Sequence, residues 1–174
     1  MAELVRTEHP AVTWWCPQLP PSPRAAMAMV AEGIAGWPRD SMAVVGSSLG
    51  GFYATWVMQQ TGCKAVLLNP AVAPARDLQR YIGEQTAWHA PEESFYFKAE
   101  YVDELKALAC PGTPDAATAD RLMAVIAKGD EVLDWREMAA RYPQSRLKLI
   151  EGGNHALADF DDHLPDILDF LGLA

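Results

Sequence analysis

Residues 42–51 read MAVVGSSLGG, in which an apolar run leads into a serine that lies between glycines. The apolar run is typical of a buried strand, and residues 49–60 repeat apolar side chains at the spacing of one helix face. Gly46 and Gly50 lie two positions on either side of Ser48 and complete the pattern GxSxG. A strand, a tight turn and a helix in this order form a nucleophile elbow, where the two backbones approach too closely to leave room for side chains. We therefore predict that Ser48 is an exposed catalytic nucleophile.

The same residues have a simpler interpretation, in which Ser47 and Ser48 cap the helix and the glycines only form a turn. A third glycine, Gly51, continues into the helix. Glycine in a first helical turn lowers helix stability, so its presence indicates close packing or the approach of a ligand. Gly51 therefore favours the elbow over the cap.

Strand-like segments alternate with helix-like segments along most of the chain. The expected strands are residues 12–16, 42–46, 64–69, 122–128 and 146–150, and the expected helices are residues 22–34, 49–60, 135–141 and 164–171. This alternation predicts an α/β fold, with a mostly parallel sheet covered by helices on both faces. Right-handed crossovers place the carboxyl ends of all the strands at one edge, where the sites of such sheets form.

The alternation is lost between residues 70 and 114, which we interpret as a small helical cap inserted into one domain that spans residues 1–174. Helical patches are expected near residues 76–82 and 99–108. The segment also contains several aromatic residues: Tyr81, Trp88, Phe95, Tyr96, Phe97 and Tyr101. They either pack the cap onto the sheet or line an apolar pocket for a substrate, and the sequence leaves both alternatives open.

A serine hydroxyl needs an imidazole to take its proton and a carboxylate to orient that imidazole. In proteins with a nucleophile elbow, the catalytic residues come along the chain in the order serine, acid, histidine. His9 and His89 therefore come too early in the chain. His155 lies in a loop directly after the expected strand 146–150, whereas His163 falls inside or at the start of the last helix. We therefore predict His155 as the base.

The expected acid is Asp130, which follows the strand 122–128 at the same edge as the elbow. It precedes His155 by 155 − 130 = 25 positions, enough for one helix and one strand. Glu131 and Asp134 are rival acids, and Asp130 has the alternative role of capping the helix that follows. Its place between serine and histidine favours the catalytic role.

Composition limits the partners of the chain. A net charge of −9 and a pI near 4.8 argue against nucleic acids and anionic membranes, which bind basic surfaces. Cys16, Cys63 and Cys110 are far apart in sequence, which predicts neither a disulfide framework nor a zinc site. No apolar run approaches 18 residues and the first ten residues do not resemble a leader, so we expect a cytoplasmic protein. The expected chemistry needs no cofactor, and the acidic residues near His155 and His163 lack HExxH or any other recognised metal-binding spacing, so we expect no metal.

Several blocks in a constant order resemble a known family. They are GSSLGG at 46–51, YATW at 53–56, NPAV at 69–72, GDEVLD at 129–134 and EGGNHA at 151–156. Together they resemble the YqiA-like esterases, which are small bacterial α/β-hydrolases, over a span from about Pro10 to Gly172. The resemblance implies the α/β-hydrolase fold, with Ser48 as nucleophile, Asp130 as acid and His155 as base.

The chain departs from that family at its beginning. Family members open with a strand and a His-Gly-Phe-type loop that supplies the second oxyanion amide, and this chain contains no His-Gly pair. The resemblance places that opening strand between the strand expected at residues 12–16 and the nucleophile strand, so without it we expect the middle of the sheet to be open. We also expect the start at Met1 to be misplaced. The Leu49 amide is then the only predicted oxyanion donor.

We accordingly expect a serine esterase that cleaves small-molecule carboxylic esters or thioesters through an acyl-enzyme. The alternative is a degenerate, non-catalytic binding module on the same fold, because the second oxyanion donor is absent from the sequence. Amidase or dienelactone-hydrolase-like chemistry differs only in the substrate and stays open, as does the oligomeric state.

Overall fold

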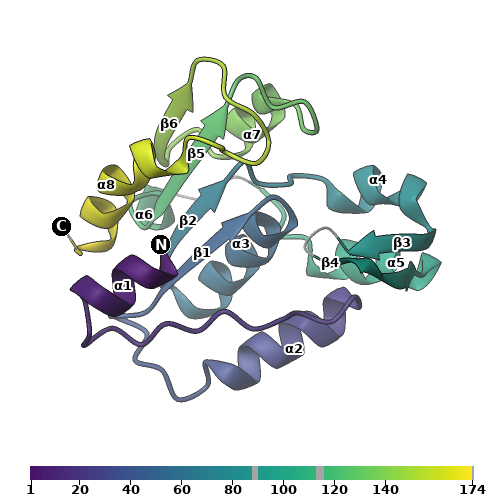
Figure 1. The fold of residues 1–174 in the computed structure, drawn as a ribbon, viewed down its shortest axis with the longest axis horizontal. Coiled ribbons are helices and arrows are strands. Elements are labelled where there is room, and N and C mark those ends of the chain that lie inside the picture. The colour runs from purple at the N-terminus through teal and green to yellow at the C-terminus, as the bar shows by residue number, and fades with distance from the viewer. Residues whose placement is uncertain (88–89, 113–115, 174) are drawn as a thin grey trace.

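The computed structural model describes residues 1–87, 90–112 and 116–173. Its centre is a four-stranded parallel sheet in the order β1-β2-β5-β6 (Figure 1). The strands are β1 (Ala43–Ser47), β2 (Lys64–Leu68), β5 (Leu122–Ala127) and β6 (Arg146–Ile150). The predicted α/β fold with a mostly parallel sheet is confirmed, and all four strands end at the same edge.

Helices cover both faces of this sheet because successive residues of a strand point to opposite sides. The principal helices are α1 (Ala2–Glu8), α2 (Pro23–Gly33), α3 (Leu49–Thr61), α7 (Trp135–Arg141) and α8 (Phe160–Leu171). Leu67 of β2 packs in one cluster with Met58 of α3 and Met138 of α7. Its neighbour Val66 packs in another cluster with Ile167 of α8. The sheet is therefore buried between α3 and α7 on one face and α8 on the other.

The strand predicted at residues 12–16 is wrong, because residues 13–20 have no regular secondary structure. Trp15 instead packs on α2, where a Cβ added to Gly33 would lie 2.3 Å from its ring. The centroids of the rings of Trp15 and Trp37 are 6.4 Å apart. Since this segment follows α2 rather than the sheet, β1 is an edge strand that pairs with β2 alone among the described residues.

The expected insertion contains more than helices. It comprises α4 (Pro74–Leu78), the 3-10 helix η1 (Gln79–Tyr81), a hairpin of β3 (Gly83–Ala87) and β4 (Ala90–Phe97), and α5 (Ala99–Leu108). A four-residue helix, α6 (Ala116–Ala119), precedes β5. The two predicted helical patches coincide with α4 and η1 and with α5, whereas the antiparallel hairpin was not predicted.

The aromatic residues of this segment divide between the core and the surface. Phe97 and Tyr101 are buried and meet edge to face, with ring centroids 5.5 Å apart. Phe95 packs on the same cluster, but Tyr81 and Tyr96 are 40% and 60% exposed. The first alternative, packing, therefore holds for Phe95, Phe97 and Tyr101. Trp88, His89 and residue 114 lie outside the described residues.

A buried carboxylate joins this segment to α2. Glu104 of α5 accepts hydrogen bonds from the Ser22 hydroxyl at 2.7 Å and from the backbone N–H of Arg24 at 3.1 Å. The same Ser22 oxygen caps α2 by accepting from the Ala25 amide at 3.2 Å. Two elements far apart in sequence are thus linked at the start of α2.

Within the described ranges, every helix is too short or too polar for a membrane span.

Candidate active site

Ser48 occupies the sharp turn between β1 and α3, with φ 53° and ψ −120°. A positive φ is costly for a residue with a side chain, and such strain gathers at functional sites. The turn is held from both sides: the Ser48 N–H donates to the Leu68 carbonyl at 2.9 Å, and the Ser48 carbonyl accepts from the Ala71 N–H at 2.9 Å. The end of β2 therefore holds the backbone of Ser48 in this conformation.

Two of the three glycines around Ser48 have no room for a side chain. A Cβ on Gly46 would lie 2.0 Å from the Gly50 carbonyl oxygen, and one on Gly51 would lie 2.7 Å from the Pro70 side chain. Gly50 differs from the prediction, because a Cβ there would meet nothing within 4 Å. Position 46 requires glycine because the backbone carbonyl of Gly50 lies against it, whereas position 50 itself has space for a side chain.

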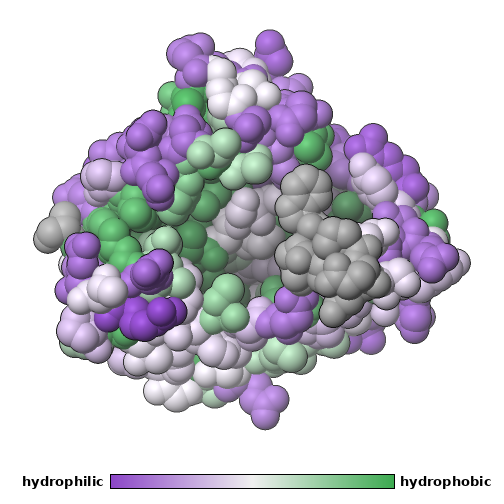
Figure 2. Space-filling model, viewed as in Figure 1, coloured by the Kyte–Doolittle hydropathy of each residue, from purple (hydrophilic) through white to green (hydrophobic). Residues whose placement is uncertain are grey.

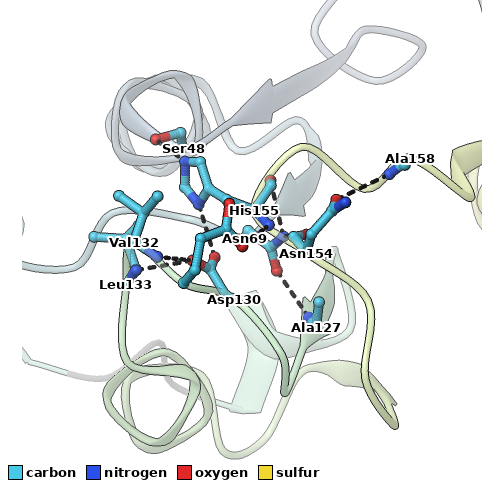
Figure 3. A network of polar contacts seen from close by, with 10 residues as sticks. Ser48, Asn69, Ala127, Asp130, Val132, Leu133, Asn154, His155 and Ala158 are labelled. Atoms are coloured by element: carbon cyan, nitrogen blue, oxygen red, sulfur yellow. Dashed lines mark hydrogen bonds and ion pairs between the residues drawn. The ribbon is translucent and has the colours of Figure 1, made fainter.

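The hydroxyl of Ser48 is not a helix cap. It makes no capping hydrogen bond to the first turn of α3, all of which the structure describes, so the cap interpretation of Ser48 is wrong. Instead, Ser48 Oγ lies 2.9 Å from Nε2 of His155. On the other side of the imidazole, Nδ1 lies 2.7 Å from Oδ2 of Asp130 (Figure 3). The three predicted residues therefore lie in contact, although each follows a different strand: β1, β5 or β6.

The two oxygens of Asp130 have separate partners. Oδ1 accepts from the backbone N–H groups of Val132 and Leu133, at 2.8 Å each. Oδ2 is left to face His155, and the side chain of Asp130 is 0% exposed while that of His155 is 20% exposed. The turn after β5 thus aims one carboxylate oxygen at the imidazole and shields it from water.

The rival acids have other partners. Glu131 accepts from the backbone N–H of His155 at 3.0 Å, so it contacts the main chain of that residue. Asp134 caps α7, accepting from the Arg136 N–H at 2.9 Å. His163 is buried in α8, and its Nε2 lies 3.3 Å from Oδ2 of Asp159.

Asn69 belongs to the same network, although the sequence did not single it out as a site residue. It directly follows β2, is 0% exposed, and donates through Nδ2 to the carbonyls of Asn154 and His155, at 3.0 Å each. Its Oδ1 accepts from the Ala127 N–H at 2.8 Å. The signal available in the sequence was a polar residue at the carboxyl end of a strand next to the nucleophile strand.

The amide of Leu49 directly follows Ser48, at the start of α3. Leu49 is the first residue of α3, so its N–H has no acceptor within the helix, and the positive end of the helix dipole lies there. Among the described residues, no three His, Cys, Asp or Glu side chains are grouped so that they could hold a metal ion.

The surface of the molecule has a depression near β1 (Figure 2). Figure 2 shows a depression in the middle of the molecule, over β1 and β2, with hydrophobic surface on the side of α8 and α1. Val45 of β1 and Leu68 of β2 belong to the apolar cluster on this side of the sheet. The depression beside the strand that leads to Ser48 is therefore apolar on the side of α8 and α1 (Figure 2).

Several solved structures share the fold of this chain. A protein from Agrobacterium vitis S4 that is described as a hydrolase is 18% identical to this chain. The two structures have a TM-score of 0.68, over 86% of this chain and 69% of that one. Est1E from Butyrivibrio proteoclasticus, solved with ferulic acid bound, is 18% identical with a TM-score of 0.54, over 86% of this chain and 66% of that one. Mouse α/β hydrolase domain-containing protein 10 is 16% identical with a TM-score of 0.54, over 86% and 70% of the two chains.

These matches show the α/β-hydrolase fold, and the chain spans about two thirds of the length of Est1E, at 66%. The family expected from the sequence is also found. A family model matches residues 1–172, and the chain therefore belongs to the YqiA-like proteins described as the uncharacterised protein family UPF0227.

Proposed function

We propose that this protein is a serine hydrolase that cleaves carboxylic esters or thioesters through an acyl-enzyme. The observation that carries the proposal is the chain of contacts from Ser48 Oγ to His155 Nε2, at 2.9 Å, and from His155 Nδ1 to Asp130, at 2.7 Å. Both distances are within the range for proton transfer between a nucleophile, its base and the group that orients the base.

The reaction begins when Ser48 Oγ attacks the substrate carbonyl and His155 Nε2 takes the serine proton. Asp130 accepts a hydrogen bond from the Nδ1–H of His155, which keeps Nε2 free as a base and stabilises the imidazolium that forms. His155 then protonates the leaving alkoxide or thiolate, and the acyl group stays on Ser48 as an ester. Water, deprotonated by His155, attacks this ester. The bond between the acyl carbon and Ser48 Oγ then breaks, His155 returns the proton to Oγ, and the carboxylic acid is released. No step requires a cofactor.

Negative charge on the carbonyl oxygen develops next to the first turn of α3. The Leu49 N–H is the donor we assign to it, because this amide has no helical acceptor. Loss of a single oxyanion donor typically slows such enzymes about 100- to 1000-fold. The Leu49 amide is therefore expected to contribute a factor of about this size to the rate.

One observation favours the alternative of a binding module without turnover. β1 is an edge strand in the described part of the chain, so no neighbouring strand brings a second amide to the carbonyl oxygen from that side. A protein of this kind would still bind an acyl group, for which the hydrophobic side of the depression in Figure 2 is the candidate surface. The two functions differ in whether Ser48 becomes acylated.

The deciding experiment treats the protein with a fluorophosphonate and, in parallel, with a short-chain aryl ester. The enzyme is expected to be modified stoichiometrically at Ser48 and to hydrolyse the ester, whereas Ser48→Ala should do neither. Ser47→Ala is the matched control, because it changes the adjacent serine and leaves the contact between Ser48 and His155 intact. A folded protein that is inert to both reagents would exclude the hydrolase and favour the binding module.

A further inference from the structure

Asn69 lies where three strand ends meet. It follows β2 directly, between the strand that leads to Ser48 and the strand that leads to Asp130. Its side chain is completely buried, at 0% exposure. Buried polar side chains are costly unless they are hydrogen-bonded, so the partners of this amide indicate why it is there.

All the strong hydrogen-bonding groups of the amide are matched. Its Nδ2 group donates hydrogen bonds to the backbone carbonyls of Asn154 and His155, and its Oδ1 accepts one from the backbone N–H of Ala127. These partners belong to the loop after β6 and to the last residue of β5 (Figure 3). One side chain thus connects the main chain that carries the imidazole to the strand that carries the carboxylate.

The backbone at Asn69 is part of this arrangement. Its φ is 40°, in the left-handed region that asparagine tolerates better than most residues. The Asn69 N–H still donates to the Val125 carbonyl at 2.9 Å, so the chain turns without leaving the sheet. The turn directs the side chain across the end of β5 toward the loop that holds His155.

We propose that Asn69 is a positioning residue for His155, which sets the distance between the imidazole and Ser48 without contacting the substrate. This inference rests on the proposed function, because it concerns the base of that reaction. Asn69 contacts this loop from the residue directly after β2, the strand next to the nucleophile strand. Loss of the amide releases the carbonyl of His155 and lets the imidazole move away from Ser48 Oγ.

Two substitutions separate the amide from the backbone conformation. Asn69→Asp keeps the shape and the acceptor for Ala127, but it places an oxygen against the carbonyls of Asn154 and His155. Asn69→Gly accepts the positive φ without strain and removes the amide. Tyr142→Phe is the control, since it removes one partner of a buried hydrogen bond, that of Thr55 at 3.0 Å, away from the three catalytic side chains.

The first measurement is the rate of fluorophosphonate labelling and of ester hydrolysis, well below the melting temperature of each variant. Displacement of a catalytic group by about 1 Å costs on the order of 100-fold. Both Asn69 variants should therefore label and turn over about 10- to 100-fold more slowly, with KM changed less than about twofold. Tyr142→Phe should lose thermal stability but keep the wild-type rates.

The second measurement does not depend on turnover. The proton between His155 Nδ1 and Asp130 should give a strongly deshielded NMR signal in the wild type and in Tyr142→Phe, and this signal should be lost or shifted in both Asn69 variants. Its persistence in a folded Asn69→Gly that labels at the wild-type rate would overturn the proposal. If the wild type itself does not react, the proposed function fails while the NMR signal still decides the role of Asn69.

If neither variant folds, the wild-type protein supplies the answer. The Nδ2 protons of Asn69 are expected to exchange with solvent far more slowly than those of an exposed amide, because they are buried and donate to two carbonyls. Exchange at the rate of a free side-chain amide would contradict the bonds on which the proposal rests.

Discussion

The carboxylate of Glu131 accepts a hydrogen bond from the backbone N–H of His155, at 3.0 Å, while the preceding carboxylate holds the ring. Two adjacent acidic residues thus contact one histidine in different ways. Glu131 holds the main chain, and Asp130 faces Nδ1 of the imidazole at 2.7 Å. Mutations at the two positions should therefore have very different effects on the rate.

Asp130→Asn should lower kcat about 10,000-fold, because the amide of asparagine favours the wrong imidazole tautomer. Glu131→Gln should change kcat less than about threefold, since the glutamine oxygen can still accept from the His155 N–H. Steady-state hydrolysis of an aryl ester by both variants measures the difference. A larger loss in Glu131→Gln than in Asp130→Asn would reverse the assignment of the acid.

Gly46→Ala should unfold the elbow, because its Cβ would lie 2.0 Å from the Gly50 carbonyl oxygen and this backbone cannot move independently. We expect a loss of at least about 3 kcal/mol in the free energy of unfolding, at the upper end of overpacking mutations. Gly50→Ala is the matched control, since nothing lies within 4 Å of its Cβ and alanine favours the helix by about 0.5–1 kcal/mol. Urea denaturation of both variants tests this, and equal stability of the two would contradict the packing described.

The site residues could be predicted because each of them follows a strand with a clear apolar pattern. The helix 135–141 and the strand 146–150 have the predicted bounds in the structure, and they place Asp130 and His155 at the correct sheet edge. The last helix begins earlier than predicted, at Phe160, since Asp161 and Asp162 lie in its first turn. Acidic residues there are stabilised by the helix dipole, although their sequence resembles a solvated loop.

The errors come from interactions that are not local. Val12, Trp14 and Cys16 alternate like a strand, but a strand requires a partner, and this segment lies along α2 instead. The hairpin begins with Gly83–Ala87, a polar segment without apolar alternation. Asn69 was missed because its partners are backbone groups 58, 85 and 86 positions away, which no side-chain pattern reveals.

The buried Glu104 should make the stability of the protein depend on pH. Burial raises the pKa of this carboxyl, but the hydrogen bonds from Ser22 and the Arg24 backbone outweigh it, so that the pKa lies below its ordinary value of 4.5. The charged form therefore stabilises the fold fully above that pH, and this contribution is lost as the pH falls through the lowered pKa.

Glu104→Gln should accordingly lower the melting temperature at pH 7, where a hydrogen bond to a charged group is worth about 1.5–3 kcal/mol. The difference from the wild type should shrink below about pH 4, because the wild-type carboxyl is then protonated as well. Glu100→Gln on the same helix is the control: its side chain is 63% exposed, so the melting temperature should change little at any pH. Melting curves between pH 3 and 7 would contradict the role of Glu104 if its variant differed from the wild type by the same amount throughout.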